Sequence, residues 1–164
     1  MKQFKNNVFD ESIPVIDTIS KYFKFTKSTD TEHNIAYKNS SRKLASKMVR
    51  QRFDKRGEYE VGETLVCRNY FKLFKKITFN ANYEYEITSV KLNTITLDHD
   101  ICVPIDIIRA NFIHGYCKTC HSFQGSSINK PMAIFDWKFQ HVNRKWIYTA
   151  CTRATNLSYV LFFN

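Results

Sequence analysis

The chain has 164 residues, enough for one ordinary domain or for one domain with a small insertion, whereas two full domains would be crowded. Apolar residues make up 43% and aromatic residues 15% of it, which provides a packed core and excludes a globally disordered chain. With 25 Lys and Arg against 15 Asp and Glu, the net charge of +10 suits a polyanion such as nucleic acid, although a basic surface that only aids solubility fits the charge alone about equally well.

The first predicted element is a helix over residues 12–24. Pro14 is acceptable there because the first turn of a helix needs no backbone N–H from it. The apolar side chains that recur at helical spacing are Ile16, Ile19, Tyr22 and Phe23. The range therefore predicts a helix with one apolar face.

A short buried strand and a second helix are predicted next. Residues 34–38 form the strand, and Ser40 or Ser41 can cap the helix that follows. The residues predicted for the inner face of this helix are Leu44, Met48 and Phe53. A strand followed by a helix indicates an α/β unit.

From Gly57 to about Ile108 the apolar residues follow a period of two, which is typical of strands. The segments that alternate or run apolar, with Asn and Asp breaks between them, are 64–68, 83–90 and 94–97. We expect a small antiparallel β module here.

The α/β pattern then returns. The predicted elements are a strand at 111–116, a turn and helix start at 124–127, a strand at 132–136, a helix around 142–154 and a strand at 157–163. This order predicts an α/β domain whose first part is 1–56 and whose remainder is 109–164, interrupted by a β insert over 57–108.

Residues 114–125 carry a polar cluster between two apolar strands, more than a simple connection needs. Hydroxyl, imidazole and amide groups at a strand end can bind phosphate oxygens without reading base sequence. The segment resembles motif V of superfamily 1 helicases, in the form typical of RecD-like members. The matching residues are Gly115, Tyr116, Thr119, His121, Gln124 and Gly125.

Residues 144–154 resemble motif VI of the same helicases. The matching residues are Tyr148, Ala150, Thr152, Arg153 and Ala154. An Arg at a helix end that projects across a domain cleft can neutralise charge on a transferring γ-phosphoryl group, and the resemblance implies this role for Arg153. A surface Arg that only complements the helix dipole is the alternative.

A weaker match covers residues 34–42, which resemble the strand-then-Asn segment where this helicase domain first contacts single-stranded nucleic acid. Lys38, Asn39 and Arg42 are its candidate phosphate contacts. A helix N-cap with ordinary solvent-facing charges explains the segment about equally well.

The predicted β module resembles the SH3-like insert that RecD-like helicases carry just before motif V. In that interpretation the basic tract Lys72, Lys75 and Lys76, interleaved with Phe71 and Phe74, guides a strand by charge and stacking. A charged hairpin that merely shields a sheet edge is the alternative.

Five cysteines without an export signal indicate reduced thiols and an intracellular protein, in cytoplasm or nucleus, including those of a virus-infected cell. No apolar run approaches the roughly 18 residues of a membrane span, so we expect no membrane partner. Cys117, Cys120 and His121 formally match a c-type haem attachment pattern, which would require export and an axial ligand elsewhere. The same cysteines with His114 or His121 could begin a zinc site, but no second ligand pair completes tetrahedral coordination, so we expect no metal site.

No phosphate-binding loop of the Gly-x-x-x-x-Gly-Lys-[Ser/Thr] type occurs in the sequence, and Phe135-Asp136-Trp137 offers only one carboxylate for Mg²⁺. Superfamily 1 motors hydrolyse ATP between two RecA-like domains, and the resemblance covers only the second. It therefore implies that ATP and Mg²⁺ are shared with an N-terminal helicase ATPase domain, and that the isolated chain is inactive. The chain can be a fragment of a larger helicase or a natural half.

The sequence thus predicts a RecA-like α/β parallel-sheet domain with an SH3-like insert, resembling the second motor domain of a RecD-like, viral-type helicase. The resemblance implies that Gln124 and Gly125 lie with Arg153 at the nucleotide-facing edge. It places Thr119 and His121 on the phosphate backbone of single-stranded nucleic acid, with DNA favoured over RNA. A non-enzymatic nucleic-acid-binding module derived from a helicase is the alternative.

Overall fold

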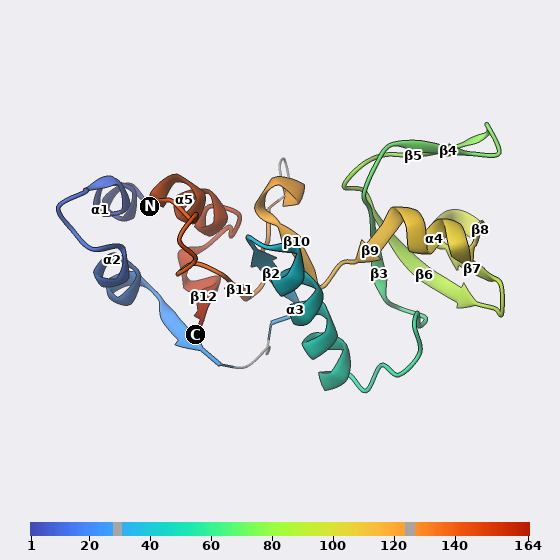
Figure 1. Ribbon diagram of the computed structural model, residues 1–164, viewed down its shortest axis with the longest axis horizontal. Helices are drawn as coiled ribbons and strands as arrows, with labels where there is room; N and C mark the ends of the chain where they lie inside the picture. Colours follow the sequence, from blue (N-terminus) through green and yellow to red (C-terminus); the bar gives the residue numbers. More distant parts are fainter. Residues whose placement is uncertain (28–30, 124–126) are drawn as a thin grey trace. The chain divides into compact units, whose positions relative to one another are not determined.

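The computed structural model describes residues 1–27, 31–123 and 127–164. These residues form two compact units, named unit 1 (residues 1–49 and 117–164) and unit 2 (residues 50–116). The chain leaves unit 1 after Val49 and re-enters it at Cys117 (Figure 1). Among the described residues, every helix falls short of the length and apolar character that crossing a membrane requires.

Unit 1 is built on a five-stranded sheet in the order β1-β12-β11-β2-β10, and all of its strand pairs are parallel. The strands are β1 (Lys24–Thr26), β2 (His33–Ala36), β10 (Cys117–Thr119), β11 (Met132–Ile134) and β12 (Val160–Phe163). Ile134 in the central strand is paired with Phe162 on one side and Ile35 on the other. The predicted α/β class with a parallel sheet is confirmed.

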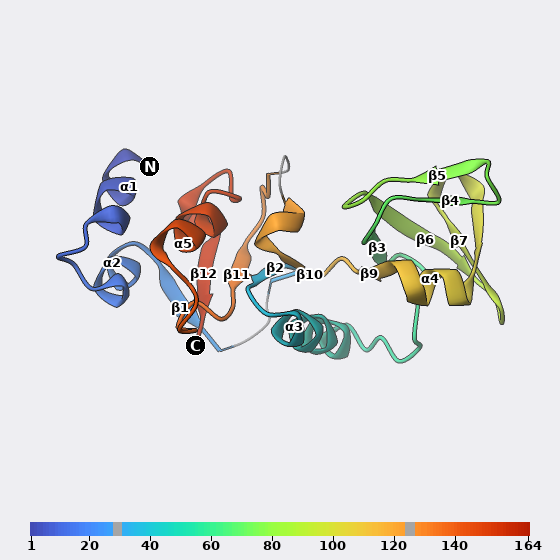
Figure 2. The same ribbon diagram turned by 45° about the horizontal axis from the view of Figure 1, so that its top comes forward.

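Helices cover both faces of this sheet (Figure 2). One face packs with Ile19 and Ile147 against α1 (Lys2–Phe9), α2 (Val15–Tyr22) and α5 (Arg144–Cys151). The other face packs with Ala45 of α3 (Asn39–Arg52) on Ala36 and Ala133. Residues of β11 alternate between these two cores, which explains why its sequence is apolar without a break.

The prediction of which residues form the buried face of α3 was wrong. Leu44 and Phe53 are exposed, and the buried residues of the helix are Arg42, Ala45, Ser46 and Val49. The sheet face beneath it is lined by alanines and Cys117, so small side chains on α3 let the helix approach closely. The predicted helix over 12–24 is confirmed in its central part as α2, although Ile16 is exposed.

Unit 2 contains an antiparallel sheet in the order β8-β7-β6-β3-β9 and a separate hairpin of β4 and β5. The strands are β3 (Thr64–Cys67), β4 (Phe71–Leu73), β5 (Ile77–Phe79), β6 (Glu84–Val90), β7 (Thr94–Leu97), β8 (Ile101–Pro104) and β9 (Phe112–His114). Its core gathers Leu65, Phe79, Ile87 and Ile108, the last from helix α4 (Ile105–Asn111). The three predicted antiparallel strands are confirmed, whereas α4 and the hairpin strands were not predicted.

Candidate functional site

Unit 1 has a cavity of about 390 Å³ beside α5, which we call the α5 pocket. Its lining residues are Tyr37, Cys120, His141, Asn143, Lys145, Trp146, Thr149 and Arg153. Tyr37 directly follows β2 and Cys120 directly follows β10, and these two strands pair with Ala36 opposite Thr119. The pocket therefore lies at the carboxyl ends of neighbouring parallel strands, where α/β proteins commonly bind ligands.

Helix α5 positions Arg153 at one wall of this pocket. The side chain of Asn143 caps the helix start by accepting from Trp146 N at 2.8 Å, and the helix ends at Cys151. Just beyond the end, Arg153 Nε donates to Thr149 O at 3.2 Å. The backbone carbonyl of Arg153 also accepts from Ile128 N at 2.7 Å, so both the side chain and the main chain of this residue are held.

The lining of the α5 pocket combines cations with aromatic rings. Lys145 and Arg153 carry positive charge, and none of the lining residues that the structure describes is acidic. The rings of Tyr37 and Trp146 meet edge to face with centroids 5.6 Å apart. Burial raises the pKa of the Cys120 thiol, against the opposing charge of Arg153. Such a lining suits an anionic ligand that also carries a flat ring.

The turn that carries Tyr37 is held by a carboxylate that sequence reasoning considered only as a Mg²⁺ ligand. Asp136 Oδ2 accepts from the backbone N–H groups of Tyr37 and Lys38 at 3.1 and 2.9 Å. Its Oδ1 accepts from Ser41 Oγ at 2.6 Å and lies 3.5 Å from Lys38 Nζ. We call these four residues the Asp136 cluster.

The three candidate phosphate contacts after β2 lie in different surroundings. The side chain of Lys38 is 42% exposed, and its ammonium also lies 4.8 Å from the centre of the Phe139 ring. Asn39 Oδ1 accepts from Arg42 Nε at 3.3 Å, and Arg42 is buried on α3. Lys38 and Asn39 are thus accessible to a ligand, whereas Arg42 is buried, and the roles of all three stay predictions.

The motif V candidates are only partly described. Thr119 ends β10, and its hydroxyl lies 2.8 Å from Ser122 Oγ. His121 belongs to a short 3₁₀ helix, Cys120–Phe123, but its side chain lies outside the described residues, as do Gln124 and Gly125 entirely. The proposed roles of these residues therefore stay predictions.

The cysteines of the haem-like and zinc-like patterns are embedded in unit 1. Cys117 is buried against α3, and burial raises the pKa of its thiol, as it does for Cys120. A raised pKa disfavours the thiolate that binds metals. Within the described ranges, no three His, Cys, Asp or Glu side chains are grouped so as to hold a metal ion.

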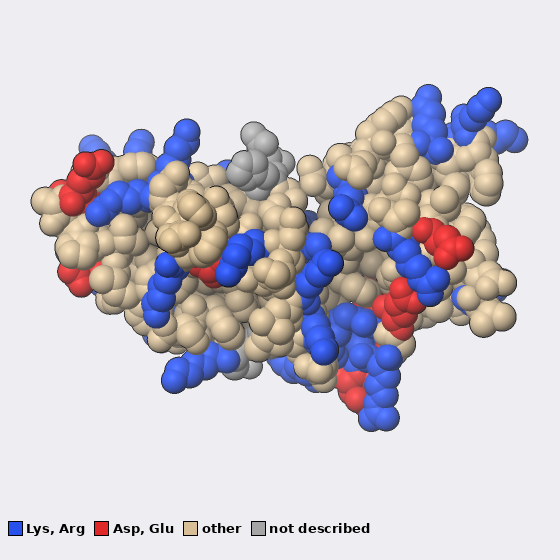
Figure 3. Space-filling model, in the orientation of Figure 1, with Lys and Arg blue, Asp and Glu red and all other residues tan. Residues whose placement is uncertain are grey.

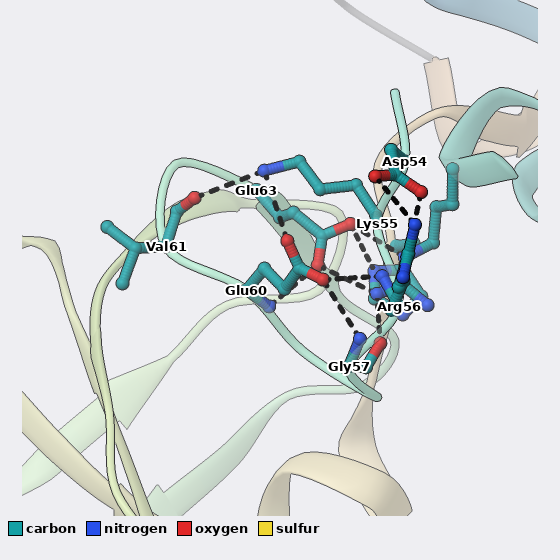
Figure 4. A network of polar contacts seen from close by, with 9 residues as sticks. Asp54, Lys55, Arg56, Gly57, Glu60, Val61 and Glu63 are labelled. Carbon is teal, nitrogen blue, oxygen red and sulfur yellow. Dashed lines mark hydrogen bonds and ion pairs between the residues drawn. The ribbon is translucent and has the colours of Figure 1, made fainter. Parts of the chain in front are cut away.

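Unit 2 has a polar cluster of its own around Glu63, whose side chain is completely buried. Glu63 accepts from Arg50 Nε at 2.7 Å and from Glu60 N at 2.8 Å. His114 Nδ1 lies 3.8 Å from the same carboxylate, and burial lowers the His114 pKa. Figure 4 shows Glu60 and Glu63 within the polar contacts of the loop from Asp54 to Glu63. We call Glu63, Arg50, Glu60 and His114 the Glu63 cluster.

Comparisons with known proteins agree with this geometry. Residues 114–161 match the sequence profile of the UvrD-like helicase C-terminal domain. In structure the chain is similar to Pif1 from Bacteroides bound to single-stranded DNA, with a TM-score of 0.59 and 14% identity over 98% of this chain and 48% of that one. The profile match covers only part of the chain, and the likeness in structure shows a shared fold. The parallel sheet of unit 1 matches a RecA-like helicase domain.

Two further Pif1 structures are similar to the same extent. The Bacteroides protein in complex with ADP-AlF3 and single-stranded DNA has a TM-score of 0.59 and 13% identity, over 98% of this chain and 48% of that one. The Candida albicans protein has a TM-score of 0.58 and 14% identity, over 100% of this chain and 54% of that one. The chain thus spans about half the length of these helicases. Comparison with curated protein sequences gives no match.

Proposed function

We propose that the chain is the second motor domain of an ATP-dependent superfamily 1 helicase of the RecD-like, viral type, with unit 2 as an SH3-like insert. One observation carries the proposal: Thr149 of α5 holds Arg153 at the wall of a pocket at the carboxyl ends of β2 and β10, and the described residues that line it include no acidic side chain. A guanidinium fixed in such a place can neutralise the charge that develops on a γ-phosphoryl group during transfer.

In this proposal ATP and Mg²⁺ bind between unit 1 and an N-terminal ATPase domain in the same or another chain. Arg153 would stabilise the transferring phosphoryl group, and Lys145, which lines the same pocket, would add a second positive charge. Gln124 and Gly125 complete the nucleotide-facing edge. The isolated chain would be inactive, because the groups that cradle the phosphates and hold Mg²⁺ come from the other domain.

Single-stranded nucleic acid, DNA rather than RNA, would bind on the other side of the same strand ends. Thr119 and His121 would contact its phosphates, with Lys38, Asn39 and Arg42 beside them. The Asp136 cluster supports coupling between the two ligands, because it holds the one turn that bears both Lys38 and Tyr37 of the α5 pocket. Closure of the cleft on ATP would then change how tightly the nucleic-acid strand is bound.

The test is to join the chain to a cognate N-terminal ATPase half and to replace Arg153 with Ala. We expect strand-stimulated ATP turnover to fall about 10³-fold while affinity for a single strand changes little, because the finger contacts the transferring phosphate alone. Arg153→Lys should restore only part of the rate, since Lys cannot form the same bidentate contact.

A matched control is Arg56→Ala, which removes an exposed Arg of unit 2 and should leave turnover unchanged. Unchanged turnover in Arg153→Ala, with single-strand binding intact, would contradict the proposal. That outcome would favour a non-enzymatic binding module derived from a helicase.

A further inference from the structure

The imidazole of His114, at the end of β9, has one nitrogen in an unusual position. His114 Nδ1 is buried and has no hydrogen-bond partner among the residues that the structure describes. It lies 3.8 Å from Glu63 Oε1, an oxygen that already accepts from Arg50 Nε at 2.7 Å. Buried polar atoms are normally paired, so this nitrogen is an exception that needs a physical explanation.

Two tyrosine rings pack on the same imidazole. The Tyr59 ring stacks on the His114 ring with centroids 5.4 Å apart, and the Tyr116 ring stacks on it at 6.4 Å. The His114 side chain is only 21% exposed. A positive charge on this ring would therefore be separated from most of the water that could solvate it.

The charged groups that act on the ring already balance one another. Arg50 and Glu63 form a buried ion pair, so a further charge on His114 would leave the site positive. Burial has the largest influence and lowers the pKa of His114; Glu63 opposes it, Arg50 adds to it, and the backbone and carboxylate of Glu58 oppose it. The phenol of Tyr59 stays neutral there, because burial raises its pKa. The site therefore favours a neutral imidazole.

The loop that carries Tyr59 is tied to α4 by an exposed ion pair. Glu58 lies 2.6 Å from Arg109, and both side chains are about half exposed. Figure 3 shows Asp and Glu side chains beside Lys and Arg side chains over α4, toward the right of the view. Such pairs contribute at most about 1 kcal/mol. The backbone of His114, by contrast, pairs with Leu65 inside the antiparallel sheet. A charged ring thus reaches water more easily by displacing Tyr59 than by leaving the sheet.

We propose that His114 is a proton-operated latch on the loop from Asp54 to Glu63: the neutral imidazole keeps Tyr59 packed on it, whereas a proton on Nδ1 displaces Tyr59 and admits water to the Glu63 cluster. The His114 pKa lies below its ordinary value of about 6.5, so the latch holds above about pH 6.5 and opens as the pH falls through the pKa of the folded state. The latch belongs to unit 2 alone, needs neither ATP nor nucleic acid, and goes beyond the proposed motor role.

The test follows the full chain by NMR from about pH 8 to about pH 5, the range in which histidines titrate. The ring signals of His114 report its pKa, which should lie below about 6.5. Hydrogen exchange of the Glu60 amide, which donates to Glu63, reports opening of the loop. We expect the protection factor of this amide to fall about tenfold as His114 takes up its proton.

Three variants separate the latch from a merely structural histidine. His114→Gln keeps a polar side chain that does not titrate in this range, so the loss of Glu60 protection at low pH should disappear. Tyr59→Ala should raise the His114 pKa toward its ordinary value because water then reaches the ring, whereas Tyr59→Phe keeps the stacked ring and should leave the pKa unchanged. The matched control is His99→Gln, a histidine of the same unit whose side chain is 82% exposed, and it should leave the pH response of the loop as in the wild type.

The proposal is overturned if the protection of the Glu60 amide is the same at both ends of the pH range, or if His114→Gln loses protection at low pH as the wild type does. It is also overturned if Tyr59→Ala leaves the His114 pKa where it was. Should His114→Gln fail to fold, the wild-type titration and the two Tyr59 variants still decide the matter. Arg153→Ala should change none of these readings, so the latch and the motor role can fail separately.

Discussion

Each unit contains one buried carboxylate that gathers polar partners, Asp136 in unit 1 and Glu63 in unit 2. Both accept backbone N–H groups and both lie near a cation. They differ in what their partners do. The partners of Glu63 come from one loop, from the end of α3 and from β9, so their contacts hold these three segments of unit 2 together. The partners of Asp136 form the turn that aims Tyr37 into the α5 pocket.

This difference shows why similar polar clusters need different interpretations. In unit 1 the carboxyl ends of parallel strands bring loops to one edge, and the Asp136 cluster holds the turn whose Tyr37 lines the α5 pocket together with Lys145 and Arg153. In unit 2 the Glu63 carboxylate bonds to Arg50 and to the backbone of Glu60 inside the fold, whereas His114 Nδ1 beside it is buried without a hydrogen-bond partner among the described residues.

The largest expected effect is on unit 2. Glu63→Gln should lower the free energy of unfolding by about 3 kcal/mol. The change breaks a buried ion pair, so Arg50 loses its counter-charge and the Glu60 N–H loses a carboxylate acceptor. Hydrogen exchange during urea titration would measure it in unit 2, while tryptophan fluorescence follows unit 1, which contains Trp137 and Trp146.

The matched control for this prediction is Glu58→Gln, which removes an exposed ion pair with Arg109 in the same unit. Exposed pairs contribute at most about 1 kcal/mol, so the control should be nearly neutral. If Glu63→Gln cost no more than Glu58→Gln, the Glu63 cluster would not hold the unit together.

Asp136→Asn should have an intermediate effect. The amide keeps one acceptor for the two N–H groups of the turn and loses the charge, so we expect a loss of about 2 kcal/mol from the stability of unit 1. Because the turn carries Tyr37 beside Trp146, tryptophan fluorescence should also change, and nucleotide-dependent turnover of the joined motor should fall. Asp17→Asn on the exposed side of α2 is the control. If Asp136→Asn were as stable as the wild type and left ATP turnover unchanged, Asp136 would not support the α5 pocket.

Local patterns sufficed to predict part of this arrangement from the sequence. The apolar run at 132–136 and the alternation at 83–90 predict strands, which the structure contains as β11 and β6. The order of strands and helices was enough to predict the α/β class with a parallel sheet. The helix predicted around 142–154 is present as α5, which is shorter and ends at Cys151, two residues before Arg153.

What the sequence did not reveal depends on contacts between distant residues. Asp136 accepts from residues 95 to 99 positions away along the chain, so no local pattern marks it as the support of a turn. The buried face of α3 consists of small side chains, which carry a weak apolar signal next to Leu44 and Phe53. Which face is buried was decided by the alanine-lined sheet, a property of other segments.

The smallest expected effect is at Lys38, and it separates the two clusters most clearly. Its ammonium lies 3.5 Å from Asp136 and its side chain is 42% exposed, so Lys38→Gln should change stability by no more than about 0.5 kcal/mol. Arg50→Gln should cost several times more, since the Arg50 side chain is only 16% exposed and leaves Glu63 buried without its cation. The same Lys38 variant should weaken binding of a single-stranded oligonucleotide, because in the proposed function the exposed Lys38 ammonium contacts a phosphate and does not stabilise the fold. A stability loss at Lys38 as large as that at Arg50, measured by urea unfolding, would mean that Asp136 depends on its cation as Glu63 does, and that Lys38 belongs to the scaffold of unit 1.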